Sequence, residues 1–153
     1  QFALAQRKLF WFDELFTYYL AILPSMDAVV AELEKGVDHH PPSYFLLMRA
    51  ASSLWPDPHV SFRIPSIVGY WLLSICLFRF VTRRTSAVFG TLAMLAPYVC
   101  AQAWVTDARP YGPSVGLLAL GFVAWQAATL PARRPWPLVL LAAAIAGAIS
   151  TSY

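Results

Sequence analysis

The sequence has 153 residues, of which 59% are hydrophobic and only 12% are charged, and its formal net charge is +3. Soluble chains carry about 25% charged residues, so this chain has too little polar surface for a water-soluble globule and too little charge for a disordered protein. The basic residues fall mostly in pairs between apolar runs, which argues against a nucleic-acid partner and predicts a membrane protein embedded in a lipid bilayer.

The first 62 residues are more polar than the rest and are predicted to form a first outer loop with short juxtamembrane helices. Capping residues, prolines and a glycine divide this region, and its middle stretch is amphipathic. None of its stretches is long and apolar enough to span a bilayer comfortably, so we expect them to lie on or in the outer leaflet. The predicted helices cover residues 14–23, with Asp13 as the cap, 25–36 and 41–55.

Residues 63–153 form the second region, in which four apolar stretches are predicted to cross the membrane. A spanning helix needs about 20 apolar residues to cross about 30 Å of hydrocarbon. Within the first stretch, Arg79 lies near enough to one end to reach the headgroups. The predicted fold class is therefore all-α, a polytopic transmembrane helical bundle. The predicted spans are residues 63–84, 85–106, 110–132 and 135–153.

Pairs of basic residues predict the orientation, because cytoplasmic loops are enriched in lysine and arginine. If Arg83-Arg84 and Arg133-Arg134 are cytoplasmic, then the first 62 residues and the turn 106–110 lie on the outer face of the membrane. Arg7-Lys8 then lies on the outer side, against this rule.

The acidic residues indicate where a functional site lies. Six of the eight acids precede residue 39, whereas Asp107 lies far from them between two apolar stretches. A lone carboxylate at the mouth of apolar helices is costly without a partner, and Arg109 is the expected partner. The predicted orientation puts this turn on the same face as Asp13 and Glu14. We therefore expect three carboxylates to converge with Arg63 and Arg109 on one outward-facing cleft.

Four short motifs follow one another along the chain: Asp13-Glu14, Asp38-His39-His40-Pro41-Pro42-Ser43-Tyr44-Phe45, Arg63-Ile64-Pro65-Ser66 and Ala108-Arg109-Pro110-Tyr111. In this order they resemble a known family, the GT-C membrane glycosyltransferases. The most similar group is the protein O-mannosyltransferase and aminoarabinose transferase-like enzymes, including the RgtA/B/C/D-like group. The resemblance covers essentially the whole chain, and it implies a partial GT-C fold, the N-terminal part of a longer enzyme. The opening on Gln1 and the last apolar stretch without a stop signal fit an expected truncation at both ends.

The resemblance implies inverting transfer of a hexose or pentose from a polyprenyl-phosphate donor to a lipid, glycan or protein acceptor. The reaction is expected at the outer face of the bacterial cytoplasmic membrane. Asp13 is the implied base, with Glu14 and Asp107 as supporting carboxylates. No cofactor is certain, and a divalent cation, Mg²⁺ or Mn²⁺, held by the paired acids is an alternative that the sequence leaves open. The implied contacts to the donor's phosphate or sugar are His40, Arg63, Arg109 and Tyr111.

These residue types suit the expected chemistry. A hydroxyl is a poor nucleophile near neutral pH, and a carboxylate that accepts its proton contributes about 10²–10⁴-fold to the rate. Fixed cations stabilise the charge that develops on the departing lipid phosphate. The resemblance also has a departure, because relatives often carry a histidine where this chain has Ser152.

Structural interpretations of the same residues stay open at this stage. Asp13 can be a helix cap, Glu14 can be placed in a first turn to favour the helix dipole, and Asp107 with Arg109 can be an ion pair that closes a helical hairpin. The whole chain can also be a segment of a transporter or an inactive fragment. Transporters show interrupted helices and charges at the membrane midplane, whereas the acids here lie at one face, which favours the enzyme.

Overall fold

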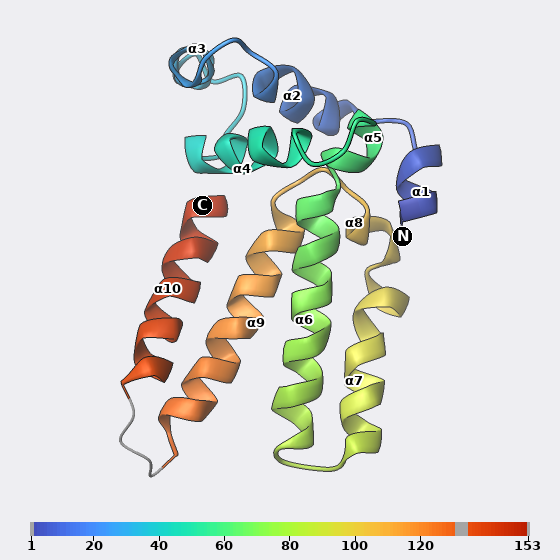
Figure 1. The fold of residues 1–153 in the computed structure, drawn as a ribbon, viewed down its shortest axis with the longest axis vertical. Coiled ribbons are helices and arrows are strands. Elements are labelled where there is room, and N and C mark those ends of the chain that lie inside the picture. Colours follow the sequence, from blue (N-terminus) through green and yellow to red (C-terminus); the bar gives the residue numbers. More distant parts are fainter. Residues whose placement is uncertain (1, 131–134, 153) are drawn as a thin grey trace.

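The structure is a computed structural model that describes residues 2–130 and 135–152. Every regular element in these residues is an α-helix, which confirms the all-α prediction. Figure 1 shows two parts: a row of four long helices, and short helices gathered over one end of it. The long helices are α6 (Ile64–Thr82), α7 (Ala87–Cys100), α9 (Tyr111–Ala128) and α10 (Trp136–Thr151).

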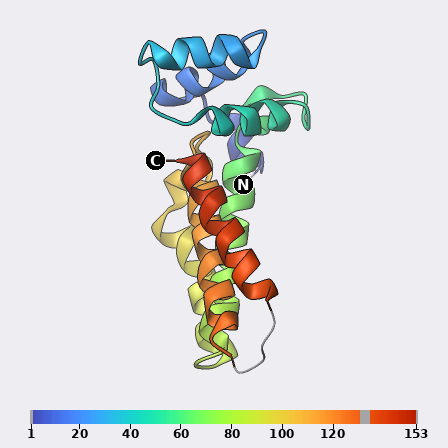
Figure 2. The ribbon, with the colours of Figure 1, turned by 90° about the vertical axis from the view of Figure 1, so that its left-hand side faces the viewer.

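The short helices form what we call the cap. It contains α1 to α5, and the short helix α8 lies at the same end, between α7 and α9 (Figure 1). The side view shows the cap extending across the end of the long helices (Figure 2). The short helices are α1 (Phe2–Arg7), α2 (Phe12–Ala21), α3 (Met26–Glu34), α4 (Pro42–Ser52), α5 (Pro58–Ser61) and α8 (Gln102–Val105).

Helices α6, α7, α9 and α10 lie within the four stretches predicted as spans. The stretch 85–106 differs from its prediction, because α7 ends at Cys100 and α8 is a separate short helix. Pro97 lies inside α7, and Ala101 departs from helical geometry with φ −121° and ψ 24°. Among the described residues, only Pro58–Thr82 is both long and apolar enough to cross a membrane.

The predicted short helices correspond to α2, α3 and α4, whereas α1 and α5 were not expected. Ser25 caps α3 by accepting a hydrogen bond from the Ala28 N–H at 3.1 Å, and Gly36, with φ 78°, follows its end. The prediction that Asp13 caps α2 is wrong. That helix begins two residues earlier than predicted, at Phe12, and the Glu14 carboxylate accepts the hydrogen bond from the N–H of the cap residue Trp11 at 2.8 Å.

A hydrophobic core holds the cap together. Helices α2, α3 and α4 meet around it, and α4 also contacts α6 and α10. Burial of each large apolar side chain contributes about 1.5–3 kcal/mol, so this core gives the cap a fixed shape. The largest fully buried members are Tyr44, Phe45, Met48, Phe62 and Val29.

Helices α6 and α9 touch through their backbones at the cap end. A Cβ atom added at Gly69 of α6 would meet the Gly112 carbonyl group and the Pro113 nitrogen, and one at Gly116 would meet the Gly69 carbonyl oxygen. Only glycine permits this approach, which positions the start of α9 and the turn before it against the start of α6.

We expect Gly69→Ala to destabilise the protein by about 1–3 kcal/mol, because the methyl group would force the two backbones apart. The matched control is Gly121→Ala on α9, where a Cβ would meet only the Leu141 and Ala144 side chains at ordinary distances of 3.7 and 3.8 Å. Thermal unfolding followed by circular dichroism in detergent micelles measures both. Equal melting temperatures for the two variants would contradict a tight backbone contact.

Candidate functional site

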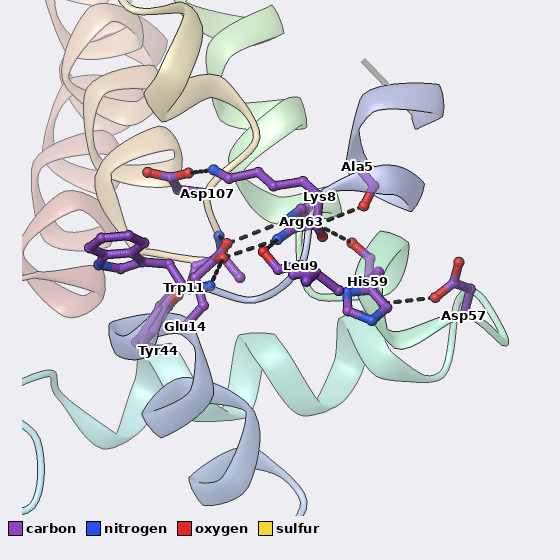
Figure 3. Close-up of polar contacts among 11 residues, drawn as sticks. Ala5, Lys8, Leu9, Trp11, Glu14, Tyr44, Asp57, His59, Arg63 and Asp107 are labelled. Atoms are coloured by element: carbon purple, nitrogen blue, oxygen red, sulfur yellow. Dashed lines mark hydrogen bonds and ion pairs between the residues drawn. The ribbon is translucent and has the colours of Figure 1, made fainter.

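The cap and the long helices are joined by a buried ion pair between Glu14 of α2 and Arg63, which precedes α6. The Arg63 Nη2 donates to Glu14 Oε2 at 3.0 Å and its Nε lies 3.3 Å from Oε1 (Figure 3). The Arg63 side chain is 0% exposed and the Glu14 side chain 1% exposed. A paired, two-point contact of this kind is the geometry that guanidinium and carboxylate groups favour.

Backbone groups satisfy the remaining hydrogen-bonding positions of this pair. Glu14 also accepts from the N–H groups of Trp11 at 2.8 Å and Ala108 at 2.6 Å. Arg63 donates to carbonyl oxygens at the end of α1 and just after it, at 2.6 Å to Ala5, 2.7 Å to Lys8 and 3.1 Å to Leu9. The pair therefore ties together four segments: the end of α1, the start of α2, the start of α6 and the turn before α9.

The pKa of Glu14 is lowered despite its burial. Burial by itself raises the pKa of a carboxyl group, but the hydrogen bonds from Arg63, Ala108 and Trp11 and the charge of Arg63 outweigh this effect. Glu14 is therefore a stably ionised, fully bonded group, and a weak base for an incoming hydroxyl. In this geometry both side chains serve the fold, and their expected roles, Glu14 as a supporting carboxylate and Arg63 as a substrate contact, stay predictions.

Arg109 has different partners from the predicted one. Its guanidinium lies 4.0 Å from an Asp13 carboxylate oxygen and 3.6 Å from Asp38 Oδ2, and it donates to the Asp13 carbonyl oxygen at 3.2 Å. The expected ion pair between Asp107 and Arg109 does not form. Asp107 is paired with the Lys8 ammonium group instead, because Arg63 fixes the end of α1 beside the turn that carries Asp107.

A pocket lined by charged side chains lies at the cap end of the long helices, with a volume of about 290 Å³. Three carboxylates, two cations and three aromatic rings surround it, and the Asp13 side chain is 53% exposed. The Trp104 and Tyr111 rings meet edge to face, with centroids 5.2 Å apart. We call it the carboxylate pocket. Its lining residues are Lys8, Trp11, Asp13, Glu14, Trp104, Asp107, Arg109 and Tyr111.

The structure brings most of the predicted site residues together, but it places His40 elsewhere. Asp13, Asp107, Arg109 and Tyr111 line the carboxylate pocket, with Glu14 in its wall. His40 lines a second cavity, described below, and its Nε2 lies 3.8 Å from Asp38 Oδ1.

The pKa of His40 is lowered, chiefly by burial and further by the charges of Arg109 and His39, which outweigh the opposing charges of Asp38 and Asp13. Its imidazole is therefore neutral at physiological pH, so it cannot act as a cationic contact to phosphate there.

Sequence reasoning missed Lys8 and Asp38 as members of the charge cluster. Lys8 belongs to a basic pair that the predicted orientation puts on the outer side, and that position is the signal for an acidic partner there. Asp38 was noted only as part of a family-like motif. The available signal is its position: Asp38 lies three residues before Pro41-Pro42, in the segment that leads into α4.

The described residues contain no group of three or more His, Cys, Asp and Glu side chains placed to hold a metal ion. Each of the open carboxylates, Asp13 and Asp107, has a cation beside it, Arg109 and Lys8 respectively. Protein cations at these positions compete with Mg²⁺ or Mn²⁺ for the same oxygens.

Comparison with known proteins gives no assignment, because no family model, no curated protein and no solved structure matches this chain.

We expect Glu14→Gln to destabilise the protein by about 3–5 kcal/mol, since it leaves the buried Arg63 charge without its partner. Asp27→Asn, at an exposed position of α3, is the control and should change the stability little. Chemical unfolding in detergent micelles at several pH values measures both effects.

Glu14→Gln should also change the pH dependence of unfolding. Because folding lowers the Glu14 pKa below its ordinary value of 4.5, the unfolded state binds the proton more readily. The stabilisation by this group is complete above pH 4.5 and is lost as the pH falls through the folded-state pKa. Glu14→Gln should flatten that fall, and a pH profile identical to that of the unmodified protein would contradict the ionised pair.

Proposed function

We propose that this chain is part of an integral-membrane glycosyltransferase of the GT-C type that uses a polyprenyl-phosphate sugar donor. The observation that carries the proposal is the carboxylate pocket. It combines an exposed carboxylate, two cations and aromatic rings at one end of a row of apolar helices. This combination suits a reaction that deprotonates a hydroxyl and stabilises a departing phosphate.

The surface of the long helices supports a polytopic arrangement. Large apolar side chains are exposed on α7, α9 and α10, among them Val99, Phe122 and Val139, and lipid is the solvent in which such a surface is stable. Helices of 14, 16 and 18 residues extend about 21–27 Å, which approaches the roughly 30 Å of hydrocarbon that a spanning helix crosses.

The basic turn at Arg83-Arg84 lies at the end of the long helices opposite the cap (Figure 1), as an inner turn would. The second basic pair, Arg133-Arg134, lies outside the described residues. In this arrangement the cap and the carboxylate pocket face the outside of the bacterial cytoplasmic membrane, and the site opens at the level of the lipid headgroups.

Asp13 is the group we assign as base. Its carboxylate is the most exposed of the three candidates, whereas Glu14 is buried and Asp107 is paired with Lys8. It accepts the proton of the acceptor hydroxyl as that oxygen bonds to the anomeric carbon of the donor sugar. The bond from this carbon to the phosphate oxygen breaks, and the phosphate leaves with the electron pair.

The cations of the pocket stabilise the leaving phosphate. Lys8 and Arg109 both line the pocket. Lys8 is paired with the Asp107 carboxylate, and Arg109 lies within ion-pair distance of Asp13 and Asp38. Apolar surface for the polyprenyl chain is available in a groove of about 350 Å³ between α9 and α10, lined by Leu118, Phe122, Trp125 and Leu141 among others. The acceptor is a lipid, a glycan or a protein.

We expect Asp13→Asn to lower sugar transfer by about 10²–10⁴-fold, because the amide cannot accept the hydroxyl proton. The complete gene is expressed in membranes, and transfer from a radiolabelled polyprenyl-phosphate sugar is measured. Asp27→Asn serves as the matched control, since it removes one exposed carboxylate of the cap without touching the pocket. Undiminished transfer in Asp13→Asn would overturn the assignment of the base.

The proposed orientation predicts which side of the membrane each end of the long helices occupies. In a background without Cys76 and Cys100, Ala31→Cys in the cap should react with an impermeant maleimide in intact cells. Thr85→Cys, in the basic turn, should react only after permeabilisation. Labelling of both positions from outside would contradict a membrane-spanning bundle, and the reverse pattern would invert its orientation.

A further inference from the structure

A second cavity, of about 520 Å³, lies between α3 and the segment that leads into α4. It is separate from the carboxylate pocket, and the function proposed above makes no use of it. We call it the α3 cavity. Its lining includes the apolar side chains of Val30, Leu33 and Pro42 and the polar side chains of Glu34, Asp38 and His40.

Two buried polar atoms at this cavity lack hydrogen-bond partners among the residues described. One is Asp38 Oδ2, on a side chain that is only 8% exposed, and the other is Nε2 of His40. The nearest charged groups lie beyond hydrogen-bonding distance, since Oδ2 is 3.6 Å from Arg109 Nη1 and Nε2 is 3.8 Å from Asp38 Oδ1. Buried polar groups in proteins are almost always bonded, so this pair indicates a ligand.

The chemistry of the two atoms selects the kind of ligand. A carboxylate oxygen only accepts hydrogen bonds, whereas the Nε2 of a neutral imidazole donates or accepts according to its tautomer. A hydroxyl group satisfies either atom, and neighbouring hydroxyls on a sugar ring satisfy both. The apolar side chains of Val30, Leu33 and Pro42 suit the C–H faces of such a ring.

Of the two carboxylates that line the cavity, Glu34 and Asp38, the buried Asp38 already has a protein cation beside it. Arg109 lies within ion-pair distance of Asp38 and already opposes its negative charge. A metal ion would need further ligands, and no group of three or more suitable side chains exists in residues 2–130 and 135–152. An uncharged, hydroxyl-bearing molecule therefore fits the cavity better than an amine or a divalent cation.

We propose that the α3 cavity is the acceptor subsite and that it binds a sugar ring through hydrogen bonds to Asp38 and His40. The role of this sugar as acceptor rests on the proposed glycosyl transfer, whereas the binding of a sugar in the cavity does not. Arg109 links the two sites, because it contacts Asp13 at the carboxylate pocket and Asp38 at the α3 cavity. Arg109 therefore stands between a sugar held in the cavity and the proposed base, Asp13.

The test measures sugar binding by the full-length protein in lipid nanodiscs. The probes are the methyl α-glycosides of glucose, mannose and galactose, and saturation-transfer NMR gives their dissociation constants. At least one should bind, and Asp38→Asn should raise its Kd about tenfold or more through the loss of a hydrogen bond to a charged group. Val30→Trp, which fills the cavity and leaves every charge in place, should abolish binding.

Two controls separate the sites. Asp27→Asn, on the exposed face of α3, should leave the Kd unchanged, and so should Trp104→Ala, which alters only the wall of the carboxylate pocket. Thermal unfolding of every variant shows that it is folded.

Absence of binding for all three glycosides would overturn the proposal. It would equally be overturned by binding that survives Val30→Trp, or by binding that Trp104→Ala removes. The proposed function is tested apart from this: glycoside binding without any transfer from the labelled donor would refute the glycosyltransferase and retain the sugar site.

Discussion

The buried ion pair of Glu14 and Arg63 is the interaction on which the arrangement of cap and long helices depends. Burying two charges is costly, and the pair is stable because each side chain also bonds to backbone groups, so that few hydrogen-bonding positions are left unmet. If Glu14 or Arg63 paired with another charged residue, that residue would lie in a different segment, and the segments would have to be arranged differently. The pair therefore specifies one arrangement, which a hydrophobic contact of the same size would define less strictly.

The carboxylate pocket is a direct consequence of this pair. Asp13 precedes Glu14, Asp107 precedes Ala108, whose N–H bonds to Glu14, and the Lys8 carbonyl oxygen accepts from Arg63. Lys8 thus bonds to the pair directly, whereas Asp13 is the chain neighbour of Glu14 and Asp107 is the chain neighbour of Ala108. The residues that hold the fold and the residues proposed for chemistry alternate along the sequence, which explains how a rigid buried contact can position exposed groups.

The sequence was sufficient to predict the all-α class and the positions of most helices, because proline, glycine and capping residues mark their ends. It also indicated which charged residues converge, but it could not assign their partners. Asp13 and Glu14 are adjacent on a helix, so they point in different directions, and only tertiary packing decides which of them is buried. The pairing of Lys8 with Asp107 likewise depends on contacts between segments far apart in sequence.

Arg63 also determines how α6 responds to its surroundings. Its guanidinium is fully enclosed and bonded to α1 and α2, so α6 cannot slide along its own axis without breaking these bonds. A helix that is anchored at one end adapts to a thinner or thicker bilayer by tilting. In a membrane, the far end of the bundle would therefore swing with bilayer thickness, while the depth of the cap relative to the start of α6 stays constant.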